Sequence, residues 1–207
     1  MSRYRDSKCK LCRNEGRKLY LKGTRCDTIK CAFERRPYGT GQHGQARKKV
    51  SEFGLQLRAK NRERRRYSIT ETQFRRYYKK AVRLKGPTDT ILFQLLESRF
   101  DNIVYKAGLV PSRAQARQMI LHGHFMVNGK KVNIPSYEVK VGQIITPKQG
   151  SDALLKTLSE GRLIPQAPRW MEVDMSNFSV KKLAKLERED VAEDTEGHLI
   201  IEYYSRN

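Results

Sequence analysis

The sequence lacks any long apolar run. Its mean hydropathy is −0.75, and no stretch approaches the roughly 18 uninterrupted apolar residues that a membrane-spanning helix needs. The segment 1–10 contains no apolar core of the signal-peptide kind. These absences exclude an integral membrane protein and predict a cytoplasmic chain. In that reducing compartment its cysteines are more typical of metal ligands than of disulfides.

Motifs of enzymes are also missing. The sequence contains no Walker lysine motif, no nucleophile elbow and no clustered pair of carboxylates. None of its four histidines has neighbours that suggest catalysis. We therefore expect neither an enzymatic activity nor a small-molecule substrate.

Acidic residues are scarce in the first part of the chain. The 207 residues carry 43 Lys and Arg against 22 Asp and Glu, a formal charge of +21. Residues 1–86 hold 27 of these bases and 7 acids, whereas 87–207 hold 16 bases and 15 acids. A charge confined to one part indicates a polyanion partner. Nucleic acid is favoured over a membrane surface, because the single tryptophan, Trp170, lies outside the basic part.

The four cysteines, Cys9, Cys12, Cys26 and Cys31, form a C-x2-C-x13-C-x4-C pattern. Each close pair can chelate one ion, and the longer loop can bring the pairs together, as a tetrahedral zinc site requires. Basic neighbours are expected to lower the pKa values of these thiols. Because the chain supplies four ligands, we expect one structural zinc ion. An iron–sulfur cluster uses the same ligands and is the alternative.

Two helices are predicted in the rest of the basic part. Ser51 can cap a helix over 52–66, in which Phe53 and Leu57 share one side. Thr70 begins a capping-box pattern that opens the next helix. In that helix apolar residues recur at three- and four-residue steps, and basic residues occupy the other side. One face is expected to pack and the other to face phosphate or water.

The near-neutral second part begins after the helix breaker Gly86-Pro87. Asn128-Gly129 lies between short apolar and basic runs and predicts a type I′ hairpin. The other predicted elements are a helix that starts at Thr88 or Asp89 and is capped by Gly108, a helix over 113–122, strands over 138–141 and 143–146, helices over 152–159 and 180–186, and a strand over 199–204.

The expected fold class is α+β, with a metal-pinned irregular N-terminal arm, a helical subdomain and a small helix-plus-antiparallel-sheet RNA-binding module. The predicted segments are the arm at 1–50, a basic helical subdomain at 51–98 completed by 180–207, the module at 99–160, and a C-terminal extension at 161–207 that packs on the helical subdomain.

The residues predicted to contact RNA phosphate are all Lys or Arg. Arg113 and Arg117 are four apart on a predicted helix, so both guanidinium groups can reach one phosphate track. The full set is Arg13, Arg47, Lys48, Lys49, Arg62, Arg64, Arg65, Arg66, Arg75, Arg76, Lys79, Lys80, Arg83, Arg113, Arg117, Lys130 and Lys131. Because these cations are many and dispersed along the chain, they favour recognition of folded RNA by its shape over the reading of base edges.

Several ordered segments resemble a known family. They are the cysteine arm, Gly41-Gln-His-Gly44, Ser51-Glu-Phe-Gly-Leu-Gln-Leu57, Gln73-Phe-Arg-Arg-Tyr77, the segment from Arg99 to Thr146, and Ile201-Glu-Tyr-Tyr-Ser-Arg206. The segment 99–146 resembles the small RNA-binding module named after the fourth protein of the small ribosomal subunit. The whole chain is similar to that bacterial ribosomal protein family.

This resemblance implies a primary ribosomal RNA-binding protein of the small subunit. Such proteins dock on a multi-helix junction in the 5′ domain of the small-subunit rRNA and nucleate assembly of the subunit body. Family members also contact the fifth small-subunit protein, influence decoding accuracy and line the mRNA entry path. Repression of their own message varies between species.

Two other classes of protein compete with this interpretation. An RNA-modifying or tRNA-charging enzyme can carry the same module, but it needs another large domain with a nucleophile or nucleotide site. A zinc-containing DNA-binding regulator needs a recognition helix and usually a dimer seam, and the sequence predicts neither. Preference for duplex DNA over structured rRNA would favour the regulator.

Residues 187–196 contain six acids and one base, which is unusual in an RNA-binding chain. A solvated loop is one interpretation. The other is a surface that faces a basic protein neighbour, with Glu189 and Asp190 as the contact residues.

Overall fold

The computed structural model describes residues 4, 6–46, 49–160, 166–191 and 195–206. Within these ranges the fold is α+β, as predicted, with helices and one antiparallel sheet of five strands. The chain divides into two compact units. Unit 1 comprises 1–92 and 192–207, and unit 2 comprises 93–191. The four-segment division stays a prediction.

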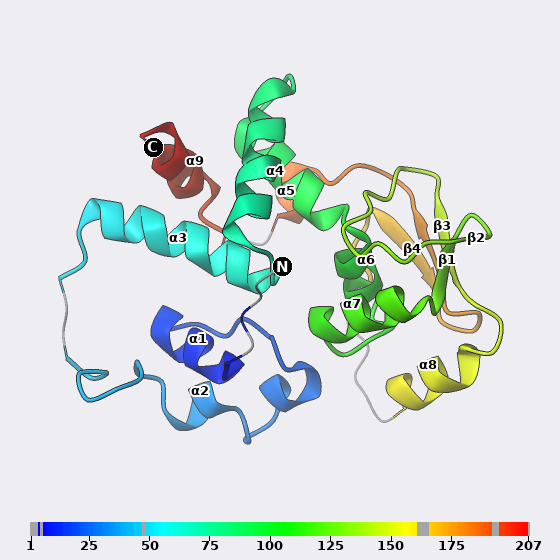
Figure 1. Ribbon diagram of the computed structural model, residues 1–207, viewed down its shortest axis with the longest axis horizontal. Helices are drawn as coiled ribbons and strands as arrows, with labels where there is room; N and C mark the ends of the chain where they lie inside the picture. Colours follow the sequence, from blue (N-terminus) through cyan, green and yellow to red (C-terminus); the bar gives the residue numbers. More distant parts are fainter. Residues whose placement is uncertain (1–3, 5, 47–48, 161–165, 192–194, 207) are drawn as a thin grey trace. The chain divides into compact units, whose positions relative to one another are not determined.

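Unit 1 is built from helices (Figure 1). They are α1 (Lys8–Glu15), the 3₁₀ helix η1 (Gly23–Asp27), α2 (Ala32–Arg35), α3 (Glu52–Arg66), α4 (Glu71–Arg83) and α9 (Gly197–Ser205). None of the described helices in either unit is long and apolar enough to span a bilayer.

The N-terminal arm is not irregular, which corrects the prediction. It contains α1, η1 and α2, and α1 ends at Gly16 in the left-handed conformation, with φ 68°. Leu11, Leu19 and Leu21 form a small core with Cys12, and Phe33 packs against it. This local core explains the order, because periodicity is hard to detect in helices as short as these.

Helix α3 begins and ends as predicted, and the Oγ atom of its cap, Ser51, accepts a hydrogen bond from Gly54 N–H at 3.2 Å. Its buried side is not the predicted one, because Phe53 is half exposed. The buried side chains include Gln56, Lys60 and Glu63. Hydrogen bonds and ion pairs, rather than apolar burial alone, therefore determine how α3 packs.

The C-terminal segment is the helix α9, not the predicted strand over 199–204. Ile200 and Tyr204 are four residues apart and both buried, so they form one helical face. The ring of Tyr204 stacks on Tyr78 of α4 at 4.6 Å between centroids. The helix lies beside α3 (Figure 1), and this tertiary packing decides between helix and strand for an ambiguous apolar run.

Helix α4 begins at Glu71, as predicted. Phe74 and Ala81 are fully buried. Within the described residues the Thr70 side chain makes no capping hydrogen bond. The carbonyl of Thr70 instead accepts the N–H of Phe74 at 3.0 Å, so the helix starts without the predicted capping box.

Unit 2 holds the sheet, in the strand order β2-β1-β3-β5-β4. Its elements are α6 (Phe100–Lys106), α7 (Arg113–His122), β1 (Phe125–Val127), β2 (Lys130–Lys131), β3 (Ile144–Pro147), α8 (Asp152–Ser159), β4 (Met171–Asp174), β5 (Ser179–Lys182) and the 3₁₀ helix η2 (Arg188–Asp190), with α5 (Thr88–Glu97) leading into it.

The hairpin of β1 and β2 turns at the predicted pair. Asn128 and Gly129 have φ values of 49° and 74°, as a type I′ turn requires. Phe100 of α6 meets Phe125 of β1 edge-on, with 6.2 Å between ring centroids. Helices α6 and α7 lie on one side of the sheet (Figure 1). The predicted helices over 113–122 and 152–159 are confirmed.

Three predictions for unit 2 are wrong. The single helix from residue 88 is two helices, because Arg99 is extended and forms an isolated bridge with Glu138. Apart from this bridge, the described structure has no strand over 138–141. The segment predicted as a helix over 180–186 is not helical, and its first residues belong to β5, which pairs with β3 and β4.

Lys182 of β5 shows why this segment is a strand. Its Nζ donates to Ser98 Oγ at 2.6 Å and to the Val139 carbonyl at 2.9 Å. The side chain is buried, and burial lowers the pKa of Lys182. A buried ammonium needs such acceptors. Ser98 and Val139 are far from Lys182 in the sequence, so the periodicity of the segment 180–186 cannot reveal these contacts.

Candidate nucleic-acid interface and cysteine cluster

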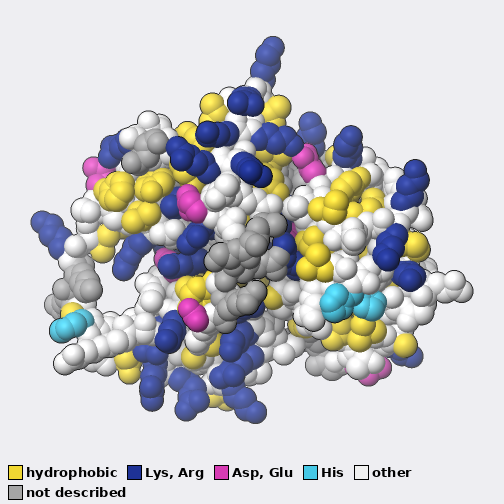
Figure 2. All heavy atoms as spheres, viewed as in Figure 1, with side chains coloured by type: hydrophobic (Ala, Val, Ile, Leu, Met, Phe, Trp, Pro, Cys, Tyr) yellow, Lys and Arg dark blue, Asp and Glu magenta, His cyan; other side chains and the backbone are white. Residues whose placement is uncertain are grey.

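Helix α4 carries a basic face. Its five cations are all exposed, and they are Arg75, Arg76, Lys79, Lys80 and Arg83. Figure 2 shows Lys and Arg side chains gathered over this helix. Phe74 and Ala81 anchor the opposite side. The helix therefore presents an ordered row of positive charge on a rigid support, which suits phosphate contacts.

The arginines at the end of α3 are placed differently, because each has a carboxylate partner within unit 1. Arg62 is buried, and its Nη1 lies 3.1 Å from Glu196 Oε1. The other pairs are Arg64 with Glu71, Arg65 with Glu15, and Arg66 with Glu63. As RNA contacts these four residues stay predictions, and Arg62 is the least accessible of them.

Glu71 connects α3, α4 and α9. Its carboxylate accepts from Tyr204 Oη at 2.6 Å and pairs with Lys60 Nζ at 3.1 Å. Burial alone would raise the pKa of Glu71, but these donors, together with Arg64, hold the pKa below its usual value. Burial and the Glu71 carboxylate raise the pKa of Tyr204. The pair therefore stays as carboxylate and phenol at neutral pH and fixes the basic helix to its neighbours.

The four cysteines lie in or directly before short helical elements. Cys9 and Cys12 are in α1, Cys26 is in η1, and Cys31 precedes α2. The N–H of Lys22 donates to Cys26 Sγ at 3.4 Å, as amides do around sulfur ligands. Among the residues that the structure describes, no three metal-ligating side chains are close enough together to hold an ion.

The charge environment of the thiols differs from the prediction. Burial raises the pKa of both Cys12 and Cys26, and the negative charges of the other cysteines add to this effect. The basic neighbours do not reverse it. Cysteine side chains are the donor type of a structural zinc site, whereas the site itself is not formed among the described residues.

Other predicted contacts of unit 1 lie in the arm. Arg13 donates from Nε to the Tyr38 carbonyl at 2.9 Å and from Nη2 to the Gly39 carbonyl at 3.0 Å. It therefore joins α1 to the loop that follows α2. Lys49 is exposed. Arg47 and Lys48 lie outside the described residues.

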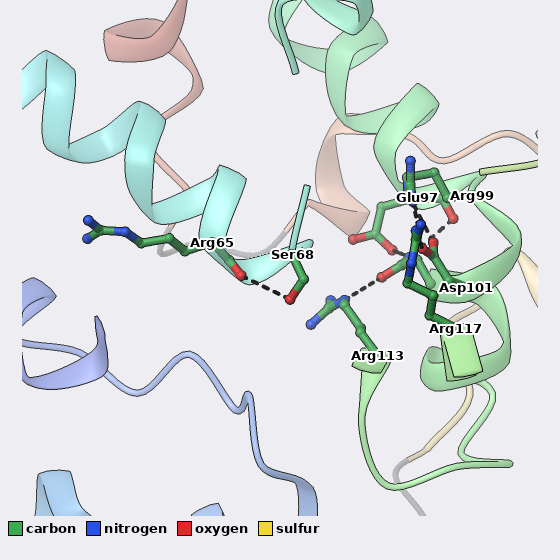
Figure 3. A network of polar contacts seen from close by, with 8 residues as sticks. Arg65, Ser68, Glu97, Arg99, Asp101, Arg113 and Arg117 are labelled. Atoms are coloured by element: carbon green, nitrogen blue, oxygen red, sulfur yellow. Dashed lines mark hydrogen bonds and ion pairs between the residues drawn. The ribbon is translucent and has the colours of Figure 1, made fainter. Parts of the chain in front are cut away.

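Arg113 and Arg117 lie at the edge of a polar network in unit 2 (Figure 3). Arg113 Nε donates to Asn102 Oδ1 at 2.8 Å. Arg117 Nη1 lies 3.7 Å from Asp101 Oδ2. The structure brings the two arginines to one side of α6. On the hairpin, Lys130 and Lys131 are exposed.

The centre of this network was not predicted. Arg99 and Asp101 form a buried fork, with Nε to Oδ1 at 3.0 Å and Nη2 to Oδ2 at 2.6 Å. Both residues stand within an apolar helical pattern. A charge at a core position needs a partner, and the opposite charge two residues away is the signal that could have revealed the pair.

The proposed protein contacts lie in η2. Glu189 is exposed and Asp190 half-buried. Asp190 Oδ2 accepts the N–H of Glu187 at 3.0 Å, as part of a capping box. Asp190 therefore has a local structural role, whereas Glu189 is the more accessible carboxylate.

Comparison with known proteins adds to this geometry. Residues 3–97 match the family model of the ribosomal protein S4/S9 N-terminal domain, and residues 98–145 match that of the S4 domain. Small ribosomal subunit protein uS4 of Acetivibrio thermocellus is 52% identical over the full length of both chains. The uS4 proteins of Heliobacterium modesticaldum and Clostridium tetani are each 50% identical, also over the full length. These relatives are ribosomal proteins and not enzymes, and the chain belongs to the family of small ribosomal subunit protein uS4.

Proposed function

We propose that this chain binds small-subunit rRNA directly, at a multi-helix junction, and thereby nucleates assembly of the body of the small ribosomal subunit. The observation that carries the proposal is the exposed basic face of α4, fixed from behind by Phe74 and Ala81. Family membership supports it, because the relatives are small-subunit ribosomal proteins.

The proposed mechanism is an electrostatic clamp. The cations of α4 displace counterions from folded RNA, and the exposed Lys130 and Lys131 of the hairpin provide a second contact. The formal charge of +21 makes the association strongly dependent on salt.

Binding to three nucleic acids at matched salt tests this function. We expect tight retention on structured rRNA and weak retention on unstructured RNA and duplex DNA, together with co-sedimentation with small ribosomal subunits after a high-salt wash. Preference for duplex DNA would contradict the proposal and favour a DNA-binding regulator.

We further propose that the chain works beside protein neighbours. These include the fifth small-subunit protein, with which it contributes to translational accuracy near the mRNA entry path. The exposed Glu189 and the half-buried Asp190 suit contact with a basic protein surface.

Charge reversal of the acidic pair is a direct test. Glu189→Lys with Asp190→Lys should weaken association with the neighbouring protein and leave rRNA affinity unchanged. Because Asp190 also caps η2, Glu189→Lys alone is the matched variant. A drop in rRNA affinity without loss of protein contact would count against this surface.

Cys9, Cys12, Cys26 and Cys31 are proposed to hold one structural zinc ion, which would crosslink α1, η1 and α2. Metal analysis with visible absorption spectra of anaerobically purified protein should find about one zinc per chain and no visible band. Cys26→Ser should lose the metal, whereas His43→Asn should retain it. Iron with a broad visible band would instead establish a cluster, and protein without metal would contradict both.

A further inference from the structure

The loop that follows α2 is fixed to α1 by two neighbouring residues. Arg13 donates from Nε to the Tyr38 carbonyl at 2.9 Å and from Nη2 to the Gly39 carbonyl at 3.0 Å. Asn14 Oδ1 accepts both the N–H and the Oγ1 hydroxyl of Thr40, each at 3.0 Å. The loop therefore begins in one defined position on a helix of the same unit.

Beyond this anchor the backbone closes into a tight turn. The N–H of Gly44 donates to the Gly41 carbonyl at 3.1 Å. Gln42 and His43 therefore occupy the two central positions of the turn. Gly44 packs so closely on the start of the loop that a Cβ atom there would lie 2.2 Å from the Gly39 carbonyl oxygen. Only glycine fits at this position, so the turn has its shape before any ligand binds.

The turn presents backbone donors to solvent. Gln42 and His43 are exposed, and among the described residues their N–H groups donate to no other atom. Adjacent N–H groups of an exposed turn form a concavity that binds anions. Arg35 and Arg36, which precede the loop, are also exposed and favour a negatively charged ligand. A phosphate group has the charge and the acceptor oxygens that this turn can bind.

An aromatic ring lies at the start of the same loop. Tyr38 is 37% exposed, and the Cζ atom of Arg13 lies 5.1 Å from its ring centroid, within the range of a cation–π contact. Because Arg13 covers one face of the ring, a nucleobase would stack on the other face. Exposed aromatic rings of this kind bind the unpaired bases of single-stranded or looped RNA.

We infer that Tyr38 and the turn 41–44 form a binding site for one unpaired RNA nucleotide. Its base stacks on the ring of Tyr38, and its phosphate accepts the N–H groups of Gln42 and His43. This inference rests on the proposed function, because it adds an RNA contact outside α4 and the hairpin. Arg13 is a positioning residue here, since its guanidinium bonds to the loop carbonyls and lies against the ring. The phosphate contact itself uses neutral backbone donors.

Two substitutions at Gln42 test the phosphate contact on the full chain by filter binding to folded rRNA. Proline is favoured at the first central position of such turns, so Gln42→Pro should keep the loop while it removes one N–H donor. It should weaken rRNA binding about tenfold. Gln42→Ala keeps the N–H and should bind like the wild type. The salt slope should stay unchanged in both variants, because neither removes a cation.

Two further substitutions test the stacked base. Tyr38→Leu should weaken rRNA binding about tenfold, whereas Tyr38→Phe keeps the ring and should match the wild type. Tyr20→Leu removes another exposed ring of the arm and is the matched control, with no expected loss. Because one nucleotide uses both contacts, Gln42→Pro combined with Tyr38→Leu should lose much less affinity than the product of the two single losses.

The possible results separate this inference from the proposed function. Wild-type affinity of Gln42→Pro or of Tyr38→Leu, or losses that multiply in the double variant, would overturn the nucleotide site and leave binding through α4 intact. A shallower salt slope of Gln42→Pro would trace its loss to displaced cations and would also contradict the site. A flat salt response of the wild type would instead overturn the proposed function. If circular dichroism shows that Gln42→Pro does not fold, the comparison of Tyr38→Leu with Tyr38→Phe decides alone.

Discussion

Neutralising the exposed cations of α4 is expected to lower rRNA affinity by about 10³-fold or more at 150 mM salt. The variant combines Arg75→Gln, Arg76→Gln, Lys79→Gln, Lys80→Gln and Arg83→Gln. All five side chains are exposed, and glutamine preserves helix propensity, so the fold should be kept. Filter binding measures the affinity, and the salt slope should become shallower by about 4 or 5.

A matched control removes the same charge from another surface. It replaces five exposed lysines of unit 2 by glutamine, namely Lys140, Lys148, Lys156, Lys181 and Lys185. If the position of the charge matters, this control should lose far less affinity than the α4 variant. Equal losses in the two variants would mean that net charge alone drives binding, and the proposed α4 interface would be wrong.

The second large effect is expected on stability. Asp101→Ala should lower the free energy of unfolding of unit 2 by about 3–5 kcal/mol, because it leaves the guanidinium of Arg99 buried without its fork partner. The side chain of Arg99 is only 1% exposed. Urea unfolding followed by Trp170 fluorescence measures the change, since this tryptophan lies in unit 2.

The double variant Arg99→Met with Asp101→Leu is the control for that prediction. Replacing both members of a buried pair by apolar residues removes the unpaired charge, so stability should recover most of the loss. If Asp101→Ala unfolds within about 1 kcal/mol of the wild type, the buried fork does not stabilise this unit.

Helix boundaries could be predicted where caps and turns are local. Ser51 and the pair Asn128-Gly129 each determine an end or a turn through neighbours within three residues, and the structure bears these out. The α4 helix was also predicted from local sequence, because its apolar residues recur at helical spacing within one continuous segment.

Predictions failed where distant partners decide the conformation. The run Leu199–Tyr204 suits a strand by composition, but packing against α3 and α4 makes it helical. Lys182 belongs to a strand because its ammonium reaches Ser98 and Val139. Such contacts over long sequence separations override local propensity.

The candidate site was predicted only in part for the same reason. Net charge pointed to the basic half, yet sequence does not distinguish an exposed arginine from one that pairs inside the fold. Arg76 faces outward, whereas Arg62 is buried against Glu196. The hydrogen bond of Arg113 to Asn102 likewise depends on how α6 and α7 pack.

The salt dependence of rRNA binding tests the electrostatic clamp most directly. Filter binding of the full chain to folded small-subunit rRNA between 50 and 200 mM salt should show a loss of affinity on the order of 10³-fold or more. The slope in the α4 variant should be shallower, because fewer counterions are released. A flat response in the wild type would contradict the account.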